Sequence, residues 1–78
     1  MPRITPIPPG RFVRVLQRLG LTVTRTSGGH VILVKEGLRR PLVVTTSYPE
    51  VPVDHIVRNL RTAGISREEY LKALDEVS

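Results

Sequence analysis

The chain has 78 residues, with 12 Lys or Arg against 7 Asp or Glu, and its formal net charge is +5 at pH 7. This length suits one small domain, which buries only about 60% of the surface that the unfolded chain exposes. The chain contains no cysteine, which excludes disulfides, thiolate metal sites and a cysteine nucleophile. Because small secreted domains usually need cross-links, and because no apolar run approaches the ~20 residues of a membrane span, we expect a cytoplasmic protein.

The excess of basic side chains indicates a polyanionic partner, with nucleic acid as the first candidate. Ten of the 12 basic residues are arginine, whose planar guanidinium group binds phosphate through two parallel hydrogen bonds. The alternative is a basic surface that is merely solvated.

The amino-terminal part of the chain divides into a lead-in and a helix. Residues 1–8 are rich in proline, so we expect an extended, largely unstructured lead-in before a single domain over residues 9–78. From Pro9 onward the apolar residues recur with the spacing of one helix face. Gly20 suits the left-handed position that ends such a helix. The residues of the apolar face are Phe12, Val15, Leu16 and Leu19.

After Gly20 the pattern changes to one of strands. Residues 21–26 alternate and predict a strand with Leu21, Val23 and Arg25 on one face. The Ser-Gly-Gly that follows predicts a tight hairpin turn, because glycine adopts the positive φ that such turns need. Residues 30–35 are nearly continuously apolar, which is typical of a central strand, and residues 42–46 predict a third strand.

The carboxyl-terminal part predicts two helices. Residues 47–52 are expected to form a loop, after which a helix opened by Pro52 repeats the apolar helical spacing and ends at Gly64. Residues 66–69 read Ser-Arg-Glu-Glu, a capping box for a short third helix. The order α-β-β-β-α-α predicts an α+β two-layer sandwich, with a three-stranded antiparallel sheet and helices on one face. Double-stranded-RNA-binding domains have a similar layout, which is an analogy of architecture alone.

Three segments carry a family pattern in the right order. The first helix ends on a leucine–glycine pattern over Leu16 to Gly20. A histidine stands between a turn and an apolar strand in "GGHVIL" (28–33). The second helix leads into "AGISREEYL" (63–71). Together, over Pro9 to Leu74, they resemble the HicA (YcfA-like) toxins, which are small bacterial and archaeal mRNA interferases.

The resemblance implies a fold like that of double-stranded-RNA-binding domains, ribosome-independent cleavage of mRNA, and silencing by a HicB-type antitoxin encoded next door. The catalytic histidine of the family lies in a Gly-Ser-His turn, and only His30 matches that position.

Histidine suits this chemistry, because near neutral pH an imidazole can accept the proton of a ribose 2′-hydroxyl or donate one to the departing 5′-oxygen. The 2′-oxygen then attacks its own phosphate, so we expect neither a metal nor a cofactor. The alternative reading is that His30 ends the turn and only hydrogen-bonds a carbonyl group.

We expect RNA contacts around His30 and along the hairpins. Glycines allow a phosphate backbone to approach closely, cations stabilise charge on the phosphate, and a tyrosine donates a hydrogen bond or stacks on a base. The candidate RNA-binding residues are Arg25, Ser27, Gly28, Gly29, Lys35, Arg39, Arg40 and Tyr48.

Two departures from the family pattern keep other functions open. Gly29 stands in place of the turn serine, and Tyr48 replaces a second histidine that many members carry, with Thr46 in place of a proline. They favour an alternative function, a non-catalytic RNA-binding or protein-interaction module of the same fold. A third reading is a plain interaction domain whose arginines are only solvated. We expect His55 to face solvent without a functional role, and the two histidines make no metal-ligand spacing.

Overall fold

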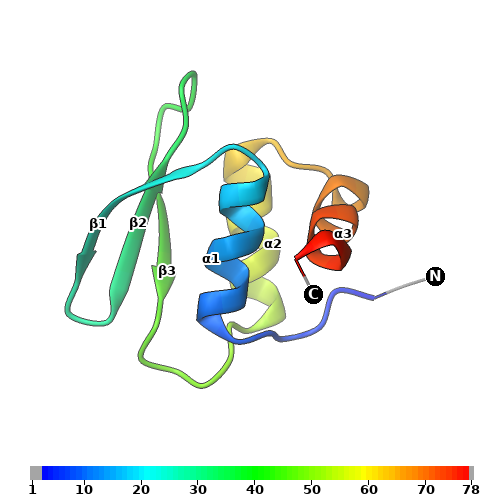
Figure 1. Ribbon diagram of the computed structural model, residues 1–78, viewed down its shortest axis with the longest axis horizontal. Coiled ribbons are helices and arrows are strands. Elements are labelled where there is room, and N and C mark those ends of the chain that lie inside the picture. Colours follow the sequence, from blue (N-terminus) through cyan, green and yellow to red (C-terminus); the bar gives the residue numbers. More distant parts are fainter. Residues whose placement is uncertain (1–2, 78) are drawn as a thin grey trace.

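The computed structural model describes residues 3–77, and it has the predicted order of one helix, three strands and two further helices (Figure 1). Residues 1–2 of the predicted lead-in and residue 78 of the predicted domain lie outside the described part. The bounds lie close to the predicted ones, and the predicted α+β fold is confirmed. The elements are α1 (Pro9–Arg18), β1 (Thr22–Ser27), β2 (His30–Val34), β3 (Leu42–Thr45), α2 (Val53–Ala63) and α3 (Arg67–Glu76).

The sheet has the strand order β1-β2-β3, and both strand pairs are antiparallel. Gly28 and Gly29 form the two-residue turn between β1 and β2 with φ of +51° and +85°, the two positive values that a type I′ turn requires. The predicted hairpin turn is therefore confirmed.

A β-bulge between Val23 and Arg25 changes the faces of β1. Val23 lies opposite the buried Leu33, whereas Arg25 lies opposite Ile32, which points to the other face of the sheet. The prediction that Arg25 shares a face with Val23 is wrong, because the extra residue of a bulge interrupts the alternation of side chains.

The helices cover one side of the sheet (Figure 1). Helix α1 contacts β1 and β3, α2 contacts β3, and α3 packs against α1. Both glycine caps are confirmed, since Gly20 and Gly64 have positive φ. After α2 the N–H of Ile65 donates to the carbonyl oxygen of Leu60 at 2.9 Å, the bond of a Schellman cap. The capping box predicted for α3 is also present.

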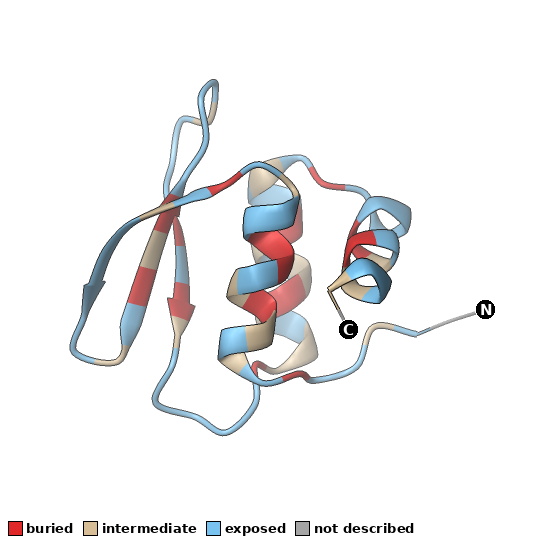
Figure 2. Ribbon diagram, in the orientation of Figure 1, coloured by how far each residue is buried: buried red, intermediate tan, exposed pale blue. Residues whose placement is uncertain are grey.

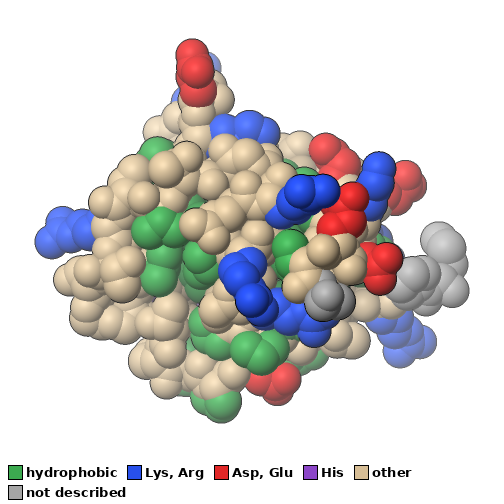
Figure 3. All heavy atoms as spheres, viewed as in Figure 1, with side chains coloured by type: hydrophobic (Ala, Val, Ile, Leu, Met, Phe, Trp, Pro, Cys, Tyr) green, Lys and Arg blue, Asp and Glu red, His purple; other side chains and the backbone are tan. Residues whose placement is uncertain are grey.

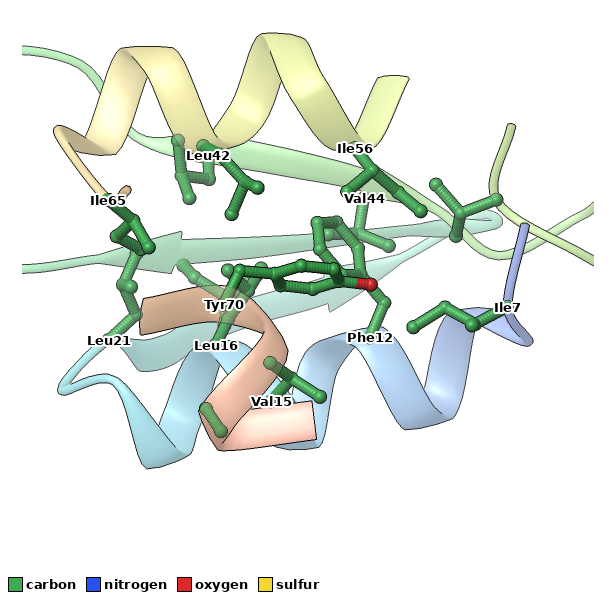
Figure 4. Close-up of a cluster of buried hydrophobic side chains, with 14 of the residues drawn as sticks. Ile7, Phe12, Val15, Leu16, Leu21, Leu42, Val44, Ile56, Ile65 and Tyr70 are labelled. Atoms are coloured by element: carbon green, nitrogen blue, oxygen red, sulfur yellow. The ribbon is translucent and has the colours of Figure 1, made fainter. Parts of the chain in front are cut away.

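The core lies between the sheet and the helices, where Figure 2 shows the buried segments. Phe12 and Tyr70 are its largest aromatic members, with ring centroids 6.1 Å apart and planes at 75°, an edge-to-face contact. The hydroxyl group of Tyr70 is buried in this cluster without a hydrogen-bond partner among the described residues (Figure 4). Burial raises the pKa of Tyr70 to about 12.

The segment before α1 is more ordered than the sequence indicates. Residues 3–6 have no regular structure, but Ile7 is only 5% exposed and forms an isolated β-bridge with Val51. The N–H of Val51 donates to the carbonyl oxygen of Ile7 at 2.7 Å. The expectation of a largely unstructured lead-in is therefore wrong at Ile7, because the extended backbone that the prolines favour can pair with another segment.

Within residues 3–77, no helix combines the length and the hydropathy that crossing a bilayer requires.

Candidate functional site

His30 opens β2 directly after the glycine turn, and its side chain is exposed. Its neighbours in the sheet are Ser27 of β1 and Thr45 of β3. The N–H of Thr46 donates to the carbonyl oxygen of Gly29 at 2.7 Å, which fastens the turn to the end of β3. The backbone of His30 is therefore held on both sides, while its ring makes no hydrogen bond to another described residue.

A pocket of about 200 Å³ opens beside His30. This volume is below the ~300–1,000 Å³ of sites for drug-sized ligands, so it suits a smaller group such as one phosphodiester. Three elements supply most of its wall, and the amide Nδ2 of Asn59 donates to the carbonyl oxygen of Val43 at 3.4 Å, which ties α2 to β3. The lining residues are His30, Val43, Val44, Thr45, Val51, His55, Arg58 and Asn59.

The second histidine of the chain lines the same pocket. His55 lies in the first turn of α2 and is half-buried, so it is less exposed to solvent than expected. His55, Arg58 and Asn59 are spaced i, i+3 and i+4, which puts them on one helix face, and that face is turned toward β3. The same helix shows both this polar spacing and the apolar spacing of its buried face in the sequence. Arg58 and Asn59 were not identified as pocket residues from the sequence.

The charges in the pocket favour an anion. Its charged or titratable lining side chains are His30 from β2 with His55 and Arg58 from α2, and no carboxylate is among the residues that line it. Figure 3 shows a face on which acidic and basic side chains are mixed and no histidine is visible. A guanidinium group without a carboxylate beside it in the pocket is suited to hold a phosphate.

Some of the predicted RNA-binding residues lie near His30. Ser27, Gly28 and Gly29 form the hairpin end beside it, and Arg25 lies on the same sheet face as His30, opposite the next residue but one of β2. Tyr48 is 57% exposed in the loop after β3 and does not line the pocket. This loop leaves the sheet at the same end as the glycine turn (Figure 1).

The other predicted RNA-binding residues lie away from His30. Lys35, Arg39 and Arg40 belong to the connection between β2 and β3, at the opposite end of the sheet. The five-residue length of β2 separates Lys35 from His30 by about 16 Å along the strand. The ammonium group of Lys35 donates to the carbonyl oxygen of Leu19 at 3.2 Å, after the end of α1. The structure does not bring these three cations to the histidine.

Ser47 is a hydroxyl-bearing residue near the turn that the sequence did not reveal. A Cβ atom on Gly29 would lie 3.5 Å from the Cβ and 3.7 Å from the Oγ of Ser47. The Ser47 side chain therefore stands beside the place that a serine at position 29 would occupy. This proximity arises from the pairing of β2 with β3, and no local sequence spacing signals it.

Among the described residues, no group of three or more His, Cys, Asp or Glu side chains could hold a metal ion.

The fold and the pocket define a class of small basic α+β domains that present a histidine at one end of an antiparallel sheet. A family model described as the HicA toxin of bacterial toxin–antitoxin systems matches residues 10–65 of this chain. The match covers more than half of the chain, which belongs to the HicA toxin family. Membership implies an antitoxin partner. No curated protein matches the chain.

Proposed function

We propose that this toxin is a metal-independent endoribonuclease that cleaves mRNA with His30 as a general acid or base. The observation that carries the proposal is an exposed imidazole that shares a pocket with the guanidinium group of Arg58. Family membership supports the same activity, since the HicA resemblance implies RNA cleavage.

The reaction needs only groups that can move protons and hold a phosphate. A neutral imidazole accepts the proton of a ribose 2′-hydroxyl, and the 2′-oxygen forms a bond to the adjacent phosphorus. The bond from phosphorus to the 5′-oxygen breaks as that oxygen takes up a proton from water, and the imidazolium later returns its own proton to the solvent. The products are a 2′,3′-cyclic phosphate and a 5′-hydroxyl end. The Arg58 guanidinium stabilises the charge that develops on the phosphate oxygens.

The second candidate is a non-catalytic RNA-binding or protein-interaction module of the same fold. The observations that favour it are Gly29 in place of the turn serine and the position of Tyr48 outside the pocket. The hydroxyl group of Ser47 beside Gly29 weakens the first of these, because it supplies a similar group at the turn.

An RNA cleavage assay separates the two candidates. Purified chain is incubated with a structured and an unstructured RNA in excess EDTA, and new 5′-hydroxyl ends are mapped. We expect cleavage by the wild-type chain and by Arg61→Ala, which removes an exposed cation of α2 outside the pocket. For His30→Ala we expect a rate lower by about 100-fold or more, with an unchanged circular dichroism spectrum. RNA binding without new ends in the wild type would establish the binding module instead.

We further propose that a HicB-type antitoxin silences the toxin by covering His30 with an acidic surface, because a chain of net charge +5 attracts an acidic partner. Competition on the His30→Ala protein tests this: each of RNA and antitoxin should displace the other. Simultaneous binding of both at full affinity would show that inhibition does not work by covering the site.

A further inference from the structure

We propose that His55 is the second proton-transfer group of this site, paired with His30 across the pocket. The proposal rests on the proposed RNA cleavage, which it deepens by assigning the acid and the base to two histidines of the same chain.

The two histidines reach the pocket from different elements. His30 opens β2, and His55 lies in the first turn of α2, 25 positions further along the chain. Strand β3 pairs with β2 and contacts α2, so it lies between the two elements. Its residues Val43, Val44 and Thr45 line the pocket between the histidines. Both histidines therefore line one pocket, which lies along β3 between the two elements that carry them.

The His55 ring is open to a ligand in the pocket. It is half-buried at the pocket wall and makes no hydrogen bond to another described residue. The other titratable or charged residues that line the pocket are His30 from β2 and Arg58 from the same helix, while β3 contributes only valine and threonine. An anionic substrate in this pocket would offer the His55 ring a hydrogen-bond acceptor.

The chemistry of RNA cleavage uses two proton transfers of opposite direction. One imidazole, in its neutral form, takes the proton of the 2′-hydroxyl as the bond from the 2′-oxygen to phosphorus forms. The other, as imidazolium, gives a proton to the 5′-oxygen as its bond to phosphorus breaks. The proton gained by the first is balanced by the proton lost by the second, and nothing is oxidised or reduced. Arg58 keeps its charge throughout and holds the phosphate.

The test compares wild type, His30→Gln and His55→Gln on two short RNAs, with Arg61→Ala as the control. One RNA has a normal linkage, and the other has sulfur in place of the 5′-oxygen at the scissile bond, a leaving group that needs no protonation. Wild type should give a bell-shaped dependence of rate on pH, and each glutamine variant should lose one limb. On the normal RNA both variants should be slower by about 10²–10⁴-fold. On the RNA with the sulfur leaving group, the variant that lacks the general acid should regain a cleavage rate close to that of wild type. The variant that lacks the general base should stay slow.

The outcomes distinguish this proposal from the proposed function. If the wild type cleaves while His55→Gln keeps its full rate and both limbs, His30 acts without His55 and this proposal is overturned alone. If His55→Gln is slow on both RNAs but keeps both limbs, His55 is a packing residue, and the proposal is equally overturned. If the wild type cleaves neither RNA, the proposed function fails together with it. Thermal unfolding of each variant shows that the protein remains folded during these measurements.

Discussion

Replacement of Tyr70 by phenylalanine removes one oxygen atom from the middle of the core. Tyr70 is 0% exposed, and its hydroxyl group has no hydrogen-bond partner among residues 3–77. A buried polar group left unpaired costs about 1–3 kcal/mol. The phenylalanine ring keeps the edge-to-face contact with Phe12, but the missing oxygen leaves a small gap, which lowers the gain. We therefore expect Tyr70→Phe to raise the free energy of unfolding by about 1 kcal/mol.

The same residue predicts a loss of stability at alkaline pH. Because burial raises the pKa of Tyr70 from 10.0 to about 12, the folded state favours the neutral phenol. The contribution of this preference to the free energy of unfolding is fully present below pH 10, the pKa of tyrosine in the unfolded chain. It is lost as the pH rises from 10 to 12. At about 1.4 kcal/mol per pH unit, the loss across this window is about 2–3 kcal/mol.

Urea unfolding followed by circular dichroism at pH 8, 10 and 11.5 measures both effects. Tyr48→Phe is the matched control: because Tyr48 is 57% exposed, this variant should keep the wild-type stability at pH 8 and the same alkaline loss as wild type, which comes from Tyr70. If Tyr70→Phe is less stable than wild type by 1 kcal/mol or more at pH 8, the reasoning is refuted. Such a loss would mean that the Tyr70 hydroxyl group of the wild type makes a hydrogen bond. An equal alkaline loss in the variant would show that another group titrates.

Three further predictions concern the turn, the last helix and the arginines. Gly29→Ser, which restores the serine of the family turn, should lower the free energy of unfolding by about 1–2 kcal/mol in a urea titration, since φ is +85° there; an unchanged midpoint would contradict it. Ser66→Ala removes the capping box of α3 and should cost about 1 kcal/mol at pH 7. The backbone N–H of Ser66 donates to the Glu69 carboxylate and lowers the pKa of Glu69, and this bond remains in the alanine variant. The loss measured by urea unfolding should therefore persist at acid pH, and a difference that vanishes there would contradict this account. Arg25→Glu should weaken binding of RNA and antitoxin more than Arg39→Glu, measured as Kd by fluorescence anisotropy, because only Arg25 shares the sheet face of His30; equal losses would place the binding surface elsewhere.

The elements of this fold could be predicted because their signals are local. Gly20 and Gly64 end two helices with positive φ, and the glycine pair before His30 makes a turn that few other residues allow. The bulge in β1 could not be predicted in the same way. The Thr-Val-Thr-Arg-Thr alternation fits a regular strand, and the extra residue is apparent only from its pairing with β2.

Only the part of the candidate site that has a local sequence signal could be predicted. His30 follows a turn with a recognisable family pattern, so its candidacy could be read from neighbouring residues. His55 lines the pocket of His30 because β3 brings β2 and α2 together, and such a contact between distant segments leaves no periodicity in the sequence. Arg39 lies in the connection between β2 and β3, at the end of the sheet opposite His30, and its contact with RNA stays a prediction.

The bridge between Ile7 and Val51 has a practical consequence for work with this toxin. Val51 also lines the pocket, so a segment that lies before the family match over residues 10–65 supports one wall of the site. A shortened chain that begins at Gly10 would keep every residue of that match but would lose the pairing of Ile7 with Val51 that supports the pocket wall. An affinity tag therefore belongs at the carboxyl end, with the residues ahead of Pro9 left in place, whenever turnover is to be measured.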